Sequence, residues 1–171
     1  GRQADEQTGA QKGLKIALFD VSDPTNPKEI SKIELGDQGS DSEILQDHKA
    51  FLLSKTKNKM VIPARIVQRM EKINDYDYRT RTWSGAIVFN VSNSGFEELG
   101  RIQHSVSEQE YYDYWQQANV KRSLYLDNLL FTISDQFLKV NNWEQSGLPL
   151  LQSIALPGSQ QRAYNQPAVS E

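Results

Sequence analysis

A short motif that occurs twice constrains the fold of this chain more than any other feature. The sequence FDVSD at 19–23 recurs as FNVSN at 89–93, and a degraded third copy begins at Phe137. The first two copies each follow an apolar strand pattern and precede a turn and another strand. Repeats at this period indicate an architecture built from stacked copies of one structural unit.

A second repeated unit lies between the copies of the motif. Segments 48–54 and 59–66 are apolar strand patterns joined by a short polar turn, and this pair is echoed by 120–126 and 129–135. The turn at Asp127-Asn128 is the type that closes a tight hairpin. The second unit is therefore a β-hairpin that alternates with the motif.

Combined, the two units predict an all-β protein, an incomplete β-propeller of about two and a half four-stranded antiparallel blades. We expect a half blade at 1–35, a blade at 36–104, a blade at 105–157 and a polar tail at 158–171. The expected strands are 14–20, 28–35, 48–54, 59–66, 84–91, 96–103, 120–126, 129–135, 137–142 and 149–156.

Two segments interrupt the repeat. Residues 67–83 are charged and rich in tyrosine, and they lie between the second and third strands of the middle blade. Residues 105–119 carry several aromatic side chains, and we expect a short helix there between two blades.

Charge and composition exclude several classes of function. The net charge of −3 gives no basic field for nucleic acid, and no apolar run is long enough to insert in a membrane. The absence of cysteine excludes disulfides and thiolate chemistry. No glycine loop for phosphate and no Gly-x-Ser-x-Gly elbow is present, and neither histidine has a serine partner at a known spacing. We therefore expect no cofactor, no metal site and no catalytic residue.

Parts of the sequence resemble a family of secreted bacterial and archaeal proteins with a C-terminal β-propeller distantly related to WD-type repeats. The resemblance rests on GRQADE at 1–6, GLKIALFDVSDP at 13–24, DHKAF at 47–51, RSLY at 122–125 with TIS at 132–134, and IALP at 154–157. It implies the C-terminal part of a propeller and a secreted or cell-surface location. It implies no reaction and no ligand.

The chain opens on glycine, which suggests a cut piece or a mature product. Two and a half blades would leave one apolar sheet face open at each end. We therefore expect the upstream blades of the same polypeptide to be the first partner.

Three residues at the start of the middle blade are candidates for ligand binding, namely Glu43, Asp47 and His48. Two carboxylates and an imidazole at the rim of a propeller channel could hold a ligand or move a proton. In the alternative interpretation, Asp47 and His48 hydrogen-bond to the backbone and fix the turn between blades. Replacing His48 would then lower stability.

The insertion provides three further candidates, Tyr76, Tyr78 and Trp83. Aromatic side chains among charges of both signs suit a glycan or a protein partner. The alternative is that they pack against a neighbouring blade that lies outside this chain.

These observations lead to one hypothesis and two rivals. The first is an exported, non-enzymatic propeller segment that binds a protein or a glycan. One rival is a fragment of a propeller hydrolase or lyase whose rim site, including Asp47 and His48, is shared with other blades. The other rival is a structural spacer.

Overall fold

The structure is a computed structural model that describes residues 1–5, 7–74, 78–104 and 119–157. Within these ranges the regular structure consists of strands and two single-turn 3-10 helices. The elements are β1 (Arg2–Ala4), β2 (Gln11–Asp20), β3 (Lys28–Leu35), η1 (Glu43–Leu45), η2 (His48–Ala50), β4 (Leu52–Ser54), β5 (Lys59–Lys72), β6 (Tyr78–Ser92), β7 (Gly95–Gln103), β8 (Val120–Leu126), β9 (Leu129–Ser134), β10 (Phe137–Asn142) and β11 (Leu150–Ala155).

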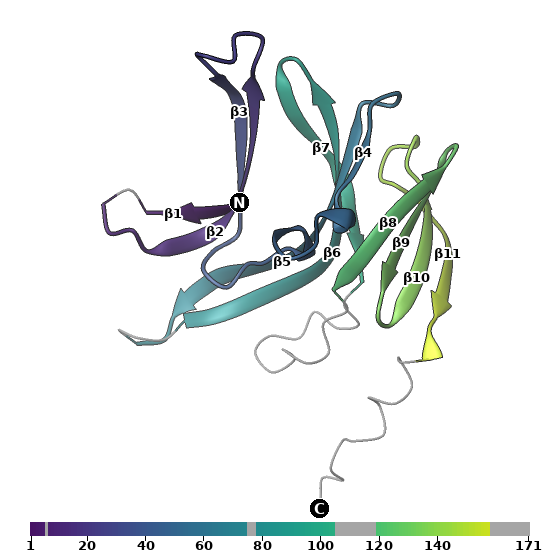
Figure 1. The fold of residues 1–171 in the computed structure, drawn as a ribbon. Helices are drawn as coiled ribbons and strands as arrows, with labels where there is room; N and C mark the ends of the chain where they lie inside the picture. The colour runs from purple at the N-terminus through teal and green to yellow at the C-terminus, as the bar shows by residue number, and fades with distance from the viewer. Residues whose placement is uncertain (6, 75–77, 105–118, 158–171) are drawn as a thin grey trace, which may run out of the picture.

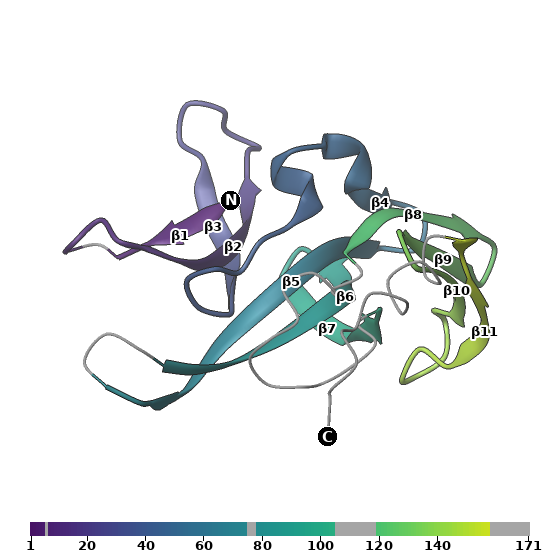
Figure 2. The same cartoon turned by 90° about the horizontal axis from the view of Figure 1, so that it is seen from below.

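The strands form three antiparallel sheets that follow one another along the chain. The first sheet has the order β1-β2-β3, the middle sheet β4-β5-β6-β7 and the last sheet β8-β9-β10-β11. The three sheets lie side by side in chain order (Figure 1, Figure 2). The prediction of an all-β, incomplete propeller is confirmed.

The repeated motif marks equivalent corners of the first two sheets. The first copy begins at the end of β2 and the second at the end of β6. In the middle sheet β6 pairs with β5 from Lys59↔Asn90 to Lys72↔Tyr78, and with β7 from Gly85↔Gln103 to Ser92↔Gly95. The strand order expected for the middle blade is therefore correct.

Strands β5 and β6 are longer than the sequence pattern indicated. Residues 67–72 and 78–83, read as an insertion, continue the two strands in antiparallel register past the end of the sheet. Charged and aromatic residues obscured the pattern because both faces of this extension are largely free of a core. The hairpin projects beneath the first sheet (Figure 1).

The first sheet contains a strand that the half-blade prediction left out. Strand β1 pairs with β2 through Arg2↔Leu14 and Ala4↔Gln11. With three polar or small residues, it has no apolar alternation from which a strand could be recognised. Counting from β3 inward, β1 occupies the position that β5 has in the middle sheet.

The innermost strand of the middle sheet is shorter than expected. Residues 48–50 form η2, and only Leu52–Ser54 pair with β5. Beyond this pairing the edge of β5 is bonded by a loop, since Asp41 and Arg65 exchange two backbone hydrogen bonds of 2.8 and 2.9 Å. Pro63, two residues earlier, faces the same loop, so its missing N–H interrupts no strand pairing.

Alternate residues of the middle sheet bury its two faces. One face packs against the first sheet, a contact we call the first seam, and the other packs against the last sheet, the second seam. The buried core of the first seam comprises Leu14, Leu35, Met60, Ile62, Ala64, Ile66, Ile87 and Phe89. That of the second seam comprises Val61, Ala86, Val88, Ile102, Val120, Leu130, Trp143 and Leu148. Because successive side chains of a strand point to opposite faces, the middle sheet packs against both neighbouring sheets at once.

Two predictions fall on residues outside the described ranges. They are the helix expected at 105–119, of which only Asn119 is described, and the polar tail at 158–171. In the described part of the chain, no helix has the length and apolar character needed to cross a membrane.

Candidate functional site

The connections that break the repeat meet at one end of the sheets. In an antiparallel sheet, strands run alternately toward and away from an end, so the β3–β4 connection and the β5–β6 hairpin emerge together. Asn119 and the start of β8 lie at the same end, since Lys121 of β8 pairs there with Glu43 of the β3–β4 connection. Side chains from three elements are thereby brought to the second seam.

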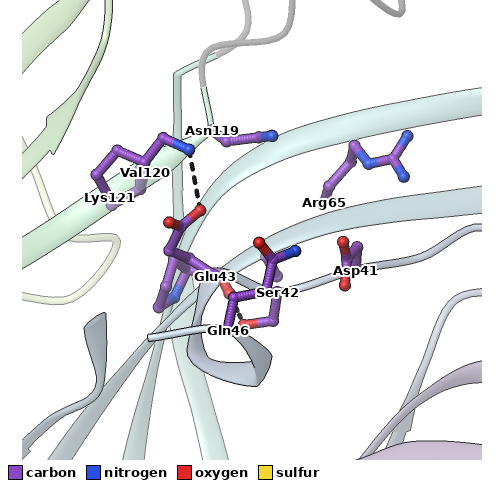
Figure 3. Close-up of a pocket in the computed structure, with 10 residues that line it drawn as sticks. Asp41, Ser42, Glu43, Gln46, Arg65, Asn119, Val120 and Lys121 are labelled. Atoms are coloured by element: carbon purple, nitrogen blue, oxygen red, sulfur yellow. Dashed lines mark hydrogen bonds and ion pairs between the residues drawn. The ribbon is translucent and has the colours of Figure 1, made fainter. Parts of the chain in front are cut away.

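A polar pocket lies at this end, between the middle and last sheets. Its volume is about 250 Å³. We call it the seam pocket. Its lining, drawn in Figure 3, comprises Asp41, Ser42, Glu43, Gln46, Pro63, Ala64, Arg65, Asn119, Val120 and Lys121. Carboxylate, amide, guanidinium and ammonium groups all border this small space.

Two ion pairs cross the second seam beside the pocket. Glu43 Oε2 lies 3.0 Å from Lys121 Nζ, and the two side chains point toward each other in Figure 3. Asp47 Oδ2 accepts a hydrogen bond from the guanidinium of Arg122. The two acids precede β4 and the two bases begin β8, so the pairs fasten neighbouring blades together.

Asp47 also caps η2. Its Oδ1 accepts a hydrogen bond of 2.9 Å from the N–H of Lys49. That hydrogen bond and, to a smaller extent, the guanidinium of Arg122 hold the pKa of Asp47 below its ordinary value. The hydrogen bond to the backbone is the contact expected in the structural interpretation.

His48 does not share this role. It is the first residue of η2, and its side chain is exposed. The expectation that it fixes the turn through a buried hydrogen bond is wrong, because a one-turn helix presents this residue to solvent. The structure thus places Glu43, Asp47 and His48 near one another but gives them different surroundings.

Hydrogen bonds also order the loop that forms the floor of the seam pocket. Ser42 donates a hydrogen bond to the carbonyl of Pro63, and Arg65 donates one of 2.8 Å to the carbonyl of Gly39. Arg2 pairs with Asp41 at 3.0 Å. The loop is therefore tied both to β5 and to the first sheet.

The aromatic candidates are only partly described. Tyr76 lies outside the described residues, and the backbone of Tyr78 opens β6 opposite Lys72. Trp83 is half-buried and packs against the core of the first seam. The guanidinium of Arg101 lies 5.5 Å from the centre of its ring. For Trp83, packing within the protein is what the structure displays.

Sequence reasoning missed a buried polar group in the second seam. His104 is completely buried, with Nδ1 3.0 Å from Ser134 Oγ and Nε2 2.7 Å from Thr132 Oγ1. Burial, with a smaller effect of nearby Lys139, lowers the pKa of His104 to about 4. The signal was present in β9, where Leu130, Thr132 and Ser134 alternate on one face. Buried hydroxyls at strand spacing require a partner.

Several of these groups already have partners within the chain. His104 and Ser134 form a pair that resembles a nucleophile and its base, yet both are buried and cannot meet a substrate. Glu43 and Asp47 are held in ion pairs. Among the residues that the structure describes, no three acidic or histidine side chains gather where a metal ion would bind.

Comparisons with known proteins give one family match and two archaeal relatives. Residues 1–146 match the family described as Beta propeller domain. An uncharacterized protein of Methanocaldococcus jannaschii is 28% identical over 134 residues, which is 77% of this chain and 16% of the relative. An uncharacterized protein of Archaeoglobus fulgidus is 26% identical over 151 residues, which is 84% of this chain and 19% of the relative.

The chain spans less than a fifth of the length of these two relatives. No solved structure matches it significantly. The family match covers most of the chain, and it agrees with three consecutive antiparallel sheets that pack face to face. The chain belongs to the β-propeller domain family.

Proposed function

We propose that this chain is a segment of an exported β-propeller and serves as a non-enzymatic binding scaffold. Its ligand is a glycan, bound through one sugar ring in the seam pocket. The observation that carries the proposal is the composition of that pocket, where charged and amide side chains from the β3–β4 connection, β5 and β8 surround about 250 Å³.

A sugar ring suits this pocket for chemical reasons. Hydroxyl groups both donate and accept hydrogen bonds, and so do the side-chain amides of Gln46 and Asn119 that line the pocket. The volume lies just below the usual range for small-molecule sites, roughly 300–1,000 Å³, which argues for a single ring instead of a large ligand. A protein ligand would contact the surface around the pocket more than its interior.

Export and kinship with WD-type repeats belong to the same proposal. Their support is the sequence resemblance to secreted propeller proteins. Upstream blades of the same polypeptide are the partners that would close the propeller ring. The rival role, a hydrolase or lyase, finds less support because Glu43 and Asp47 are engaged by cations.

Saturation-transfer NMR with a panel of free neutral hexoses, N-acetylhexosamines and uronic acids tests the proposal. The variant Gln46→Ala removes an exposed pocket side chain while leaving both ion pairs in place. We expect saturation transfer to one class of sugar and its loss in this variant. Glu97→Gln, an exposed change on β7 away from the pocket, is the matched control and retains binding.

Equal signals from the wild type and Gln46→Ala would place binding elsewhere and contradict the proposal. Absence of transfer from every sugar would also contradict it. Turnover of a glycoside that stops in Asp47→Asn would favour the hydrolase or lyase instead.

A further inference from the structure

A second surface of the molecule lacks a partner that the rest of the fold supplies. Strand β2 runs to Asp20, but β1 pairs with it only as far as Lys15. Among the described residues, no strand lies along this edge of β2 from Ile16 onward. An unpaired strand edge offers backbone donors and acceptors to another strand.

The repeat shows how far the missing pairing should extend. In the middle sheet β5 accompanies β6 through the second copy of the motif, with Met60 opposite Phe89 and Lys59 opposite Asn90. The equivalent residues of β2 are Phe19 and Asp20. By this equivalence, the strand to which β1 belongs continues along β2 to Asp20.

The register of that strand follows from bonds already formed. Gly1 and Lys15 exchange two backbone hydrogen bonds, each 2.8 Å long. In an antiparallel pair the next residue to bond on the same side is two positions along, which is Ala17. The residue directly before Gly1 would then lie opposite Ile16, and the third residue before it opposite Leu18.

An apolar groove lies beside this edge. Its volume is about 350 Å³, and Leu18, Phe51 and Leu53 contribute to its walls. Phe51 and Leu53 are exposed by 41% and 44%, although they lie at the start of the middle blade, next to the first seam. Side chains opposite Ile16 and Leu18 share their face of the sheet and would enter this groove.

We propose that this edge and groove receive an extended strand, supplied by the polypeptide that precedes Gly1 and continuing β1. The strand carries apolar residues at the first and third positions before Gly1, and its backbone bonds to Ala17. The length of the relatives supports this source, since the chain spans 16% and 19% of them. The inference does not depend on the seam pocket or its ligand.

The test extends the full chain at its N-terminus by five residues. The matching extension reads Thr-Thr-Val-Thr-Val, which places valine opposite Ile16 and Leu18. The control reads Thr-Val-Thr-Val-Thr, which turns valine to the opposite face, because a shift of one residue reverses every side chain. Exchange of the Ala17 amide is measured by NMR, with Ile16, whose amide faces β3, as the internal reference.

We expect the matching extension to slow exchange at Ala17 by about tenfold or more, because a strand hydrogen bond protects the amide. We also expect a higher Tm than in the control extension and a monomer in both proteins. If the samples associate at NMR concentrations, exchange of the peptide 14–20 is followed by mass spectrometry at micromolar concentration.

Three results would overturn the proposal. The first is an Ala17 amide already protected in the monomeric unextended chain, which would mean that another segment covers the edge. The second is a dimer in which Ala17 is protected, which would make a second copy the occupant. The third is equal exchange in the matching and control extensions.

Discussion

The two faces of the middle sheet differ in how completely the neighbouring sheet covers them. In the second seam the last sheet contributes four strands, and Leu130 and Trp143 are fully or almost fully buried. In the first seam the first sheet contributes two long strands and a short one, and an apolar groove remains. Ile87 and Phe89 of the first seam are also fully buried, so the difference lies at its edge beside the groove, where β1 is short.

Polar contacts connect the two sheets of the second seam at both ends and in its interior. The second seam has ion pairs at both ends, Glu43–Lys121 at one and Glu144 with Lys57 and Lys59 at the other. Its interior holds the His104 hydrogen bonds. Buried polar groups of this kind are satisfied only when both sheets are complete and fixed in register. A complete blade thus fixes its neighbour through specific contacts as well as apolar packing.

The largest expected effect compares one substitution in the two seams. Leu130→Ala in the second seam should lower the free energy of unfolding by about 4 kcal/mol, because the enclosed cavity cannot collapse. Leu14→Ala in the first seam borders the groove, where neighbours can relax, and should cost about 2 kcal/mol. Urea unfolding of both variants measures the difference.

The exposed Leu150→Ala is the control and should change little. Equal losses for Leu130→Ala and Leu14→Ala would mean that the first seam is as tightly sealed as the second. The comparison would then fail, whatever the absolute values.

Acid should weaken the second seam through His104. In the folded protein the pKa of His104 is lowered from 6.5 to about 4. Between these two values the imidazole is protonated in the unfolded chain and neutral in the folded chain. Stability is therefore complete above pH 6.5 and decreases as pH falls toward about 4. The full shift corresponds to about 3 kcal/mol.

Chemical denaturation at pH 7, 6, 5 and 4.5 measures this slope. The points at pH 7, 6 and 5 carry the slope, because paired carboxyl groups begin to lose their own contributions below about pH 5. His104→Gln keeps a polar side chain without the titration and should flatten the dependence between pH 6.5 and 4.5. An unchanged slope in this variant would assign the acid sensitivity to other groups.

A smaller effect is expected at the far end of the second seam. Glu144 accepts hydrogen bonds from Lys57 and Lys59, which lower its pKa below the ordinary value. Glu144→Gln should lower stability by about 1 kcal/mol or less, since the carboxylate is largely in water. The loss should shrink in 1 M NaCl, and a loss that persists there would indicate packing instead of charge.

The repeat was enough to predict the sheets, and it located even β11, whose residues are all exposed, from its place after the third copy of the motif. It could not reveal β1 or the extension of β5 and β6, since these stretches lie outside the repeated units and have no apolar alternation of their own. Strand pairing there depends on the neighbouring strand and not on local composition.

The candidate site was predictable only in part. Glu43, Asp47 and His48 were found because a polar cluster stands at a repeat corner, but their partners Lys121 and Arg122 are far away in sequence. His104 was set aside because it has no serine at a motif spacing. Its partners instead lie on a strand of the next blade, and only the packing of two sheets brings them together.

The smallest expected effect concerns His48, which borders the same turn as Asp47 but has a different environment. Its side chain is exposed, so His48→Ala should change the free energy of unfolding by no more than about 0.5 kcal/mol, as is usual for surface positions. Asp47→Ala removes both the cap of η2 and the bond to Arg122, and should lower Tm measurably. Thermal unfolding of the two single variants at pH 7 makes the comparison. A loss in His48→Ala as large as that in Asp47→Ala would mean that the imidazole helps to hold the second seam, and that the turn is fixed by both residues.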